Sequence, residues 1–141
     1  MNNGTALVTG ASLGIGKATA LRLLDDGFTV YAAARRLEHM VPLDRADAHL
    51  IALDPTDDES IVNAVESVRR ESGRIDVLVN NPGCAIYGAL EDMPLAEVRR
   101  QFEVNLFGAG RLCQLVLPIM RAQRSGKIIN VSSVGGKSGS R

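Results

Sequence analysis

The stretch from Thr5 to Gly16 constrains this chain more than any other part of its sequence. Residues 6–8 are apolar and predict a short buried strand, which leads into a loop with glycines at positions 10, 14 and 16. A helical pattern begins at Ile15. Glycine permits sharp turns and a close approach of a ligand to the backbone, and the first turn of a helix offers unpaired N–H groups and the positive end of its dipole. The stretch therefore suits a diphosphate, the alternative being a structural glycine turn without a ligand.

Two common nucleotide-binding patterns do not fit this loop. The phosphate-binding loop G-x-x-x-x-G-K-[ST] would need a glycine where Ala11 stands and a hydroxyl where Ala18 stands. The glycine spacing here is G-x-x-x-G-x-G, which also differs from the G-x-G-x-x-G pattern of many dinucleotide-binding sheets. The function of the loop has to be judged together with the rest of the chain.

Three further motifs follow the glycine loop in order: N-N-P-G at 80–83, Asn105, and N-V-S-S at 130–133. With T-G-A-S-L-G-I-G at 9–16, they resemble the motifs of the short-chain dehydrogenase/reductase family over the whole chain. The resemblance implies an oxidoreductase that transfers a hydride between a nicotinamide ring and a small-molecule carbonyl or alcohol carbon. The alternative, from a different class, is a nucleotide-binding or interaction module without chemistry of its own.

Apolar strand-like segments alternate with helical patterns along the chain, with an irregular polar piece before the third strand. Strands are predicted at 6–8, 28–34, 49–53, 75–79 and 127–131, and helices at 15–26, 57–72 and from 94 to about 123, the last interrupted near 105–110. This alternation favours a parallel sheet with right-handed crossovers. We expect an α/β fold for residues 1–141, a Rossmann-type doubly wound sheet in the order 3-2-1-4-5 with helices on both faces. Ligands bind such sheets at the carboxyl ends of the strands, where the order reverses.

The residues after the second strand favour one coenzyme. In dinucleotide-binding sheets an acidic residue at this place bonds the 2′-hydroxyl of NAD, whereas an arginine can hold the 2′-phosphate of NADP. Here Ala34 stands in place of the acid and is followed by Arg35 and Arg36. Guanidinium groups pair well with phosphate oxygens. NADP(H) is therefore favoured over NAD(H), with Arg35 as the main contact and Arg36 auxiliary; the alternative is two solvated arginines.

The resemblance assigns the rest of the coenzyme site residue by residue. It comprises Gly10, Ser12, Leu13, Gly14, Ile15, Gly16, Asp54, Asn81 and Gly83. Asp54 would accept a hydrogen bond from the adenine amino group, but Pro55 lacks the N–H that family members commonly offer to the adenine ring. Pro82 replaces the usual alanine and restricts Asn81 towards extended geometry.

The catalytic residues implied by the resemblance are Ser133 and Asn105. Ser133, with Ser132 as the neighbouring alternative, would hydrogen-bond the substrate oxygen, and Asn105 would hold a helix irregularity and a water of a proton relay. The general acid of the family is the tyrosine of Y-x-x-x-K, whose pKa of about 10 must be lowered by a nearby cation. Neither Tyr31 nor Tyr87 has a lysine four residues later. We therefore expect an N-terminal part of a longer enzyme, inactive alone.

Composition narrows the range of partners. Sixteen basic residues balance sixteen acidic ones, so nothing favours nucleic acid or an anionic membrane. No uncharged apolar run reaches the roughly 18 residues needed to span a bilayer, and the N-terminus is unlike a secretory signal. Cys84 and Cys113 fit neither a metal site nor a disulfide framework, which indicates a cytoplasmic protein without a metal. The nearly all-apolar segment 106–120 predicts burial on more than one side and hence a homo-oligomer.

Overall fold

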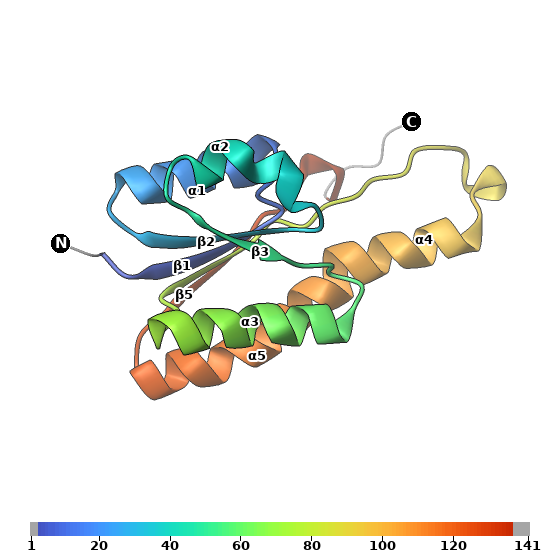
Figure 1. Cartoon of the computed structure of the whole chain (residues 1–141). Coiled ribbons are helices and arrows are strands. Elements are labelled where there is room, and N and C mark those ends of the chain that lie inside the picture. The colour runs from blue at the N-terminus through green and yellow to red at the C-terminus, as the bar shows by residue number, and fades with distance from the viewer. Residues whose placement is uncertain (1–2, 137–141) are drawn as a thin grey trace.

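Five strands form one parallel sheet in a computed structural model that describes residues 3–136 (Figure 1). Their order is β3-β2-β1-β4-β5, and every neighbouring pair is parallel. The strands are β1 (Thr5–Thr9), β2 (Thr29–Ala34), β3 (His49–Ala52), β4 (Val77–Asn80) and β5 (Lys127–Asn130). The predicted fold class and strand order are confirmed.

Helices cover both faces of the sheet. The α-helices are α1 (Gly14–Asp25), α2 (Val41–Asp44), α3 (Asp58–Ser72), α4 (Leu95–Phe102) and α5 (Gly108–Gln123). In Figure 1, α1 and α2 lie on one face and α3 and α5 on the other, while α4 and the loop before it project beyond the sheet. Single turns of 3₁₀-helix occupy Leu37–Met40, Leu90–Asp92 and Val134–Gly136.

The core consists of two apolar layers separated by the sheet. Along β1, Leu7 joins the layer under α3 and α5, whereas Ala6 and Val8 join the layer under α1 and α2. Successive side chains of a strand point to opposite faces, so a strand covered on both sides must be apolar throughout. This explains why the sequence of β1 shows a continuous apolar run rather than an alternating one.

Helix α3 follows its predicted pattern closely. The side chain of Asp57 accepts a hydrogen bond of 3.0 Å from the N–H of Glu59 and caps the first turn. Gly73 ends the helix with a left-handed φ of 73°. The four residues predicted to face the core at i, i+3, i+4 and i+7 are all buried: Ile61, Ala64, Val65 and Val68.

The polar piece between β2 and β3 is more regular than the sequence indicated. Leu37–Met40 forms a 3₁₀ turn that continues directly into α2. Met40 and Leu43, three residues apart, are both fully buried, so this piece closes the layer beside α1. The apolar side chains of Leu37 and Val41 remain exposed, so only part of the apolar pattern of this piece faces the core.

The long helical region after Pro94 is interrupted by a π-helical turn at Glu103–Phe107. This turn joins α4 to α5 and contains Asn105. The sequence predicted an interruption at 105–110, so its existence is confirmed and its start lies two residues earlier. A π-helical turn carries an extra residue per turn and is frequent at functional sites.

Asp76 ties together the starts of three strands. Its carboxylate accepts the N–H of Thr5 at 2.8 Å and two bonds from the Arg74 guanidinium, at 2.8 and 2.6 Å. Its backbone N–H donates to the carbonyl of Thr5, and its carbonyl accepts from the N–H of Lys127. The bond from Arg74 is the main reason that the pKa of the Asp76 carboxyl lies below its ordinary value.

Replacing Asp76 by alanine is expected to lower the free energy of unfolding by about 1–3 kcal/mol, because the buried N–H of Thr5 loses its acceptor. Asp76→Asn keeps an acceptor but removes the charge. A carboxyl whose pKa is lower in the folded state contributes stability above its unfolded pKa of about 4, and this contribution is lost as the pH falls through the folded pKa. Urea unfolding between pH 7 and 3 should therefore show a shallower acid loss for Asp76→Asn. Parallel curves for this variant and the wild type would contradict the assignment.

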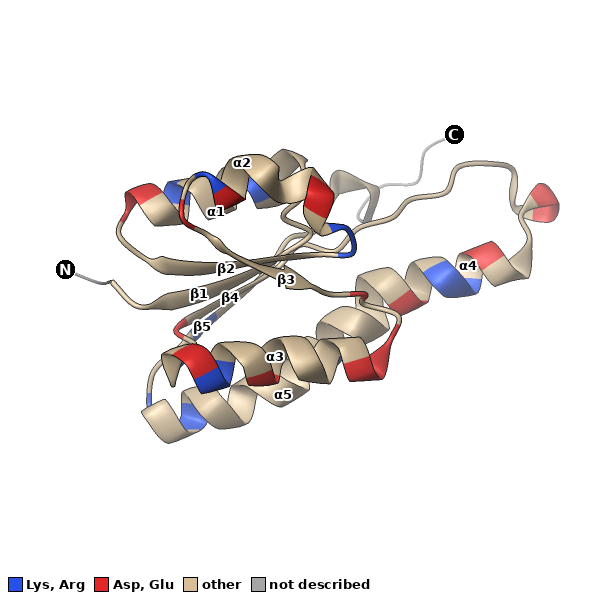
Figure 2. Cartoon of the chain, viewed as in Figure 1, with Lys and Arg blue, Asp and Glu red and all other residues tan. Residues whose placement is uncertain are grey.

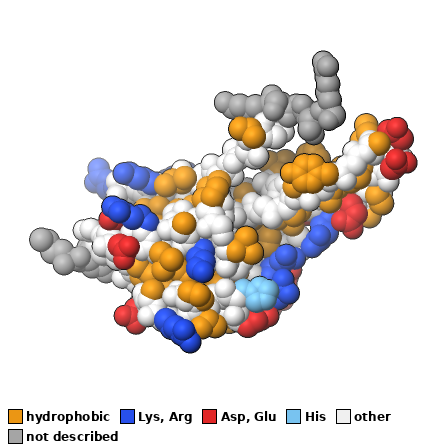
Figure 3. Space-filling view, turned by 90° about the horizontal axis from the view of Figure 1, so that it is seen from above, with side chains coloured by type: hydrophobic (Ala, Val, Ile, Leu, Met, Phe, Trp, Pro, Cys, Tyr) orange, Lys and Arg blue, Asp and Glu red, His pale blue; other side chains and the backbone are white. Residues whose placement is uncertain are grey.

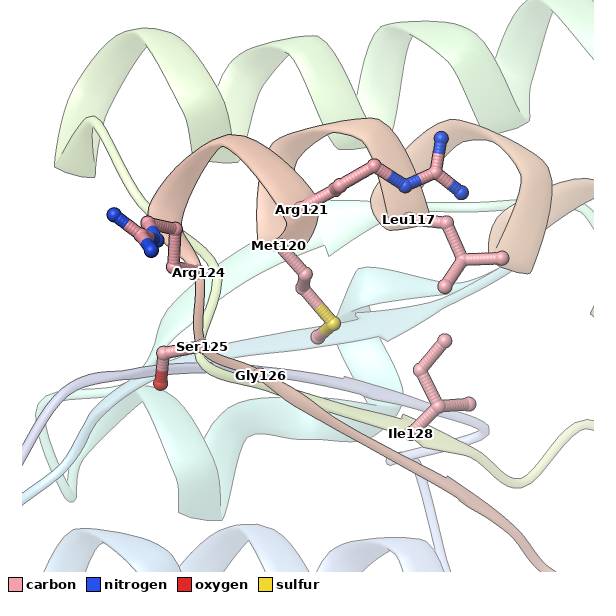
Figure 4. A pocket seen from close by; sticks show the side chains of 7 residues that line it. All are labelled: Leu117, Met120, Arg121, Arg124, Ser125, Gly126 and Ile128. Carbon is pink, nitrogen blue, oxygen red and sulfur yellow. The ribbon is translucent and has the colours of Figure 1, made fainter.

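An open groove lies where α5 passes over the start of β5 (Figure 4). It has a volume of about 560 Å³. Its lining combines apolar side chains with two arginines at the rim: Leu117, Met120, Arg121, Arg124, Ser125, Gly126 and Ile128. The groove lies at the amino end of β5 and is therefore remote from the carboxyl ends of the strands, where the sequence predicts the ligand.

Within residues 3–136, no helix has both the length and the apolar character required to cross a bilayer. The same part of the chain contains no group of three or more His, Cys, Asp or Glu side chains arranged to hold a metal ion.

Candidate functional site

The glycine loop between β1 and α1 is shaped by contacts that leave no room for side chains. Gly10 has a left-handed φ of 62°, and a Cβ on it would meet the backbone oxygen of Asn81. A Cβ on Gly16 would meet the backbone oxygen of Gly10 and would lie 2.6 Å from Nδ2 of Asn81. Glycine is therefore required at both positions by the packing of the loop against α1 and the segment after β4.

Hydrogen bonds join this loop to the end of β4. The hydroxyl of Thr9 donates to the carbonyl of Val79 at 3.3 Å and accepts from the N–H of Asn81 at 3.0 Å. The side chain of Asn81 donates to the carbonyl of Gly10 at 3.4 Å. Since β1 and β4 are the strands between which the sheet order reverses, these bonds fix the crevice where doubly wound sheets bind ligands.

The first turn of α1 faces this crevice without a side-chain cap. Leu13 precedes the helix and makes no capping hydrogen bond, and no acidic residue lies in the first turn. The side chains of Leu13 and Ile15 are 69% and 63% exposed. Helix N–H groups that lack an internal partner attract anions, so the cradle formed by the loop and the helix fits a diphosphate group.

The two arginines predicted to select the coenzyme lie in an exposed turn directly after β2 (Figure 2). Asp54 follows the neighbouring strand β3 and accepts the N–H and the hydroxyl of Thr56 on Oδ1, at 2.9 and 2.7 Å. Partial burial alone would raise the pKa of Asp54. The bonds from Thr56 and the positive charges of Arg35 and Arg100 outweigh that effect and lower the pKa of the carboxyl.

Arg100, on α4, is a cation near this end of the sheet that the sequence did not single out. Its positive charge is one of the causes that lower the pKa of Asp54, in the loop after β3. On the face seen from above in Figure 3, basic side chains gather beside a histidine, towards the projecting part of the chain whose tip is acidic. Basic side chains are thus concentrated on this part of the surface, although the chain as a whole carries no net charge.

Asn105 lies in the π-helical turn and is fully engaged with the loop after β4. Its Oδ1 accepts the N–H of Cys84 at 3.0 Å, and its Nδ2 donates to the carbonyl of Cys84 at 2.8 Å. One helical turn earlier, Oε1 of Gln101 accepts the N–H of Ile86 at 3.0 Å. The sequence identified Asn105 but not Gln101.

Asn80, at the end of β4, holds the neighbouring strand and helix. Its Nδ2 donates to Oδ1 of Asn130 at 2.9 Å and lies within 3.3 Å of the Ala109 carbonyl and of Sγ of Cys113. Its Oδ1 is buried and has no partner among the described residues. The sequence placed the adjacent Asn81 at the coenzyme, and the anchoring role of Asn80 was missed.

Ser133 follows β5 and therefore lies at the carboxyl end of the sheet. It is exposed, and its hydroxyl accepts the N–H of Gly135 at 3.2 Å. Ser133 and Asn105 share this end of the sheet, but no hydrogen bond joins them within the described residues. Gly83 is exposed and directly precedes Cys84, whose backbone is hydrogen-bonded to the Asn105 side chain.

Comparison with known proteins decides the family. The family model for short chain dehydrogenases matches residues 4–141. The chain belongs to the short-chain dehydrogenase family. It is 44% identical over 133 residues to the 3-ketodihydrosphingosine reductase of Bacteroides thetaiotaomicron, a match that covers 94% of this chain and 48% of the relative. The chain thus spans about half the length of this curated relative.

Solved structures of short-chain dehydrogenases superpose closely on the chain. A metagenomic short-chain oxidoreductase in complex with NADP is 36% identical with a TM-score of 0.92, covering 98% of this chain and 66% of its own. An NAD⁺-bound xylitol dehydrogenase is 32% identical with a TM-score of 0.93, and the match covers 99% of this chain and 56% of the xylitol dehydrogenase chain. Structures with either coenzyme resemble this chain, so the fold alone does not select between them.

The two tyrosines of this short-chain dehydrogenase chain lie in the core and in the projecting loop. Tyr31 is 2% exposed in the core and stacks on His49, with 4.6 Å between ring centroids. Burial, and then the neighbouring Glu71, raise the pKa of Tyr31 above its ordinary value, which is the opposite of what a general acid near neutrality needs. Tyr87 is 86% exposed in the projecting loop.

Proposed function

We propose that the chain is the coenzyme-binding part of an NADP(H)-dependent oxidoreductase that interconverts a carbonyl compound and an alcohol. The observation that carries this proposal is the glycine cradle, in which Gly10 and Gly16 exclude side chains and the uncapped start of α1 faces the crevice. When bound, the coenzyme supplies or accepts a hydride on its nicotinamide ring.

Different segments of the chain would bind different parts of the coenzyme. The loop 10–16 and the first turn of α1 would bind the diphosphate. Arg35 and Arg36, after β2, would hold the 2′-phosphate, and Asp54 would bond the adenine amino group with the carboxylate oxygen that Thr56 does not use. Towards β4 and β5, Asn81, Gly83 and the catalytic candidates Ser133 and Asn105 would surround the nicotinamide and the substrate oxygen.

The preference for NADP(H) is supported by charge. The two residues directly after β2 are arginines and not an acidic residue, and the positive charges of Arg35 and Arg100 both act on the carboxylate of Asp54. A phosphate ester placed in this field gains charge-assisted hydrogen bonds. An acidic residue at the same place would repel it, so the arginine turn favours the phosphorylated coenzyme over NAD(H).

Isothermal calorimetry tests the proposal on the chain itself. Titrations with NADPH and NADH, at equal ionic strength, are expected to show binding of both with the higher affinity for NADPH. A folded preparation that binds neither coenzyme at millimolar concentration would contradict the proposed function. Equal affinities would contradict the preference and leave the function in place.

A second candidate, a nucleotide-binding module without chemistry, is favoured by the two tyrosines. Tyr31 is committed to the core, and neither tyrosine begins a Y-x-x-x-K motif. The two candidates differ in turnover. The 141-residue chain is proposed to bind NADPH without oxidising it in the presence of aldehydes or ketones, whereas a longer protein with that motif would oxidise it.

The remaining parts of the proposal concern partners and location. A carbonyl or alcohol substrate is supported by the name of the Bacteroides relative, which is a reductase of a keto compound. Self-association is supported by exposed aromatic side chains on the helices that follow the projecting loop, Phe102 and Phe107, at 52% and 58%. A cytoplasmic location is supported by the free thiols of Cys84 and Cys113.

A further inference from the structure

Gln101 is a hydrogen-bonding anchor of the loop after β4 that neither a motif nor the proposed function accounts for. It lies in the last turn of α4, four residues before Asn105. Its Oε1 accepts the N–H of Ile86 at 3.0 Å. Ala85, which lies between the bonded residues Cys84 and Ile86, is exposed.

The spacing of the two anchors matches the segment that they hold. Gln101 lies in the last turn of α4 and Asn105 in the π-helical turn that follows, and both side chains bond the loop after β4. Residues two apart on an extended chain lie about 6.6 Å apart and direct their N–H groups to the same side. Gln101 bonds Ile86 and Asn105 bonds Cys84, so the two amides take alternate residues of the segment, as a neighbouring strand would.

The Asn105 amide reproduces one element of a strand partner most closely. It exchanges both an N–H and a carbonyl bond with Cys84, which is the pattern of a hydrogen-bonded pair in an antiparallel sheet. The amide of Gln123 makes the same pair of bonds with Ile75 before β4, at 2.9 and 3.0 Å. Side-chain amides thus replace strand partners on both flanks of β4.

The clasped segment lies on the nicotinamide side of the proposed site. The arginine turn after β2 marks the adenosine side, and the glycine loop after β1 marks the diphosphate. In the order β3-β2-β1-β4-β5, the segment 81–86 after β4 lies on the other side of the diphosphate from the adenosine. Asn81 fixes its start on Gly10, and the two amides fix its end.

Resting on the proposed function, we propose that Gln101 is a positioning residue: with Asn105 it holds residues 84–86 as a fixed wall at the nicotinamide end of the coenzyme site. Gln101 acts through its acceptor oxygen on the N–H of Ile86 and does not touch the coenzyme. The wall is preformed, so the coenzyme does not have to order it on binding.

An isosteric pair of substitutions tests this role. Gln101→Glu keeps an acceptor oxygen at the same position, whereas Gln101→Met has a similar length and no comparable acceptor; both are good helix formers and are expected to fold. Hydrogen exchange of the Ile86 amide and calorimetric titration with NADPH are measured for each. Gln101→Met is expected to exchange faster and to bind NADPH about fivefold more weakly, the effect of one net hydrogen bond. Gln101→Glu should match the wild type in both.

Gln114→Met is the matched control and should leave NADPH affinity unchanged. Gln114 is exposed on α5, and its oxygen accepts a bond of 3.4 Å from Arg111. Equal NADPH affinity of Gln101→Met and the wild type would overturn the inference alone. Equal weakening by Gln101→Glu and Gln101→Met would also overturn it, because the acceptor would then be irrelevant. Absence of NADPH binding by the wild-type chain would instead contradict the proposed function, and the inference with it.

Discussion

Replacement of Gly16 by alanine is expected to weaken NADPH binding by at least about tenfold. The added Cβ would meet the backbone oxygen of Gly10 and would lie 2.6 Å from Nδ2 of Asn81. Backbone cannot move aside as a flexible side chain can, so the loop must open away from the start of α1. Such overpacking typically costs about 1–3 kcal/mol, and about 1.4 kcal/mol corresponds to a tenfold change in affinity.

Calorimetry with NADPH checks this expectation at a temperature where circular dichroism shows the variant to be folded. Gly110→Ala is the matched control: a Cβ on Gly110 meets nothing within 4 Å in α5. It should leave NADPH affinity unchanged and raise stability by up to about 1 kcal/mol, because alanine favours a helix over glycine. Wild-type affinity in Gly16→Ala would show that the coenzyme does not use the loop as proposed.

The double replacement Arg35→Asp and Arg36→Ala is expected to lower the ratio of NADPH to NADH affinity by about 100-fold. Charge-assisted hydrogen bonds contribute about 1.5–3 kcal/mol each, and 100-fold corresponds to about 2.7 kcal/mol. The new carboxylate would also repel the 2′-phosphate and would be placed to bond the 2′-hydroxyl of NADH. The loss should therefore fall on NADPH, with NADH affinity unchanged or higher.

The measurement is a pair of titrations, one with each coenzyme, at two salt concentrations. The same change of charge can be made remotely by Arg121→Asp with Arg124→Ala, because both arginines lie on the rim of the groove at the other end of the sheet. This control should keep the wild-type ratio. An unchanged ratio after the replacement at Arg35 and Arg36 would refute the coenzyme assignment.

The fold was predictable because each of its elements depends on local patterns. The glycine loop marks the junction of β1 with α1, apolar runs mark strands covered on both faces, and strand–helix alternation limits the sheet to a few orders. The piece that forms α2 was missed because it is short and mixes the buried Met40 and Leu43 with exposed charged and apolar residues. The burial of Met40 and Leu43 depends on how the segment packs against the sheet, which the local sequence does not show.

The glycines of the coenzyme crevice could be predicted from the sequence in the same way. The polar residues that hold the surrounding segments in place could not. Glycines 10 and 16 could be selected from spacing, and the structure shows why each excludes a side chain. Thr9, Gln101 and Asn80 act instead through contacts with residues far away in the sequence, such as the bond from Asn80 to Asn130. A polar residue at a strand end or on a helix carries no sequence signal for such a partner.

Pro55 and Pro82, the two prolines that depart from the family's pattern, both lie in segments held by contacts with neighbouring elements. Pro82 follows Asn81, whose backbone and side chain both reach the glycine loop, so the stiffer backbone is compatible with the contacts that close the crevice. Pro55 lies against the start of α5, where a Cβ on Gly108 would meet its backbone oxygen. The loop after β3 is therefore braced by a helix as well as by the turn at Thr56.

The central position of β1 determines how this polypeptide can be divided. The first strand made is hydrogen-bonded to β2 on one side and to β4 on the other. A cut between α3 and β4 would yield one piece with β1, β2 and β3, and a second piece whose strand β4 had lost its inner neighbour. The strand Thr5–Thr9 is thus shared by both sides of the sheet. Any split-protein or circularly permuted form must keep this strand connected to the carboxyl-terminal piece or let the two reassociate.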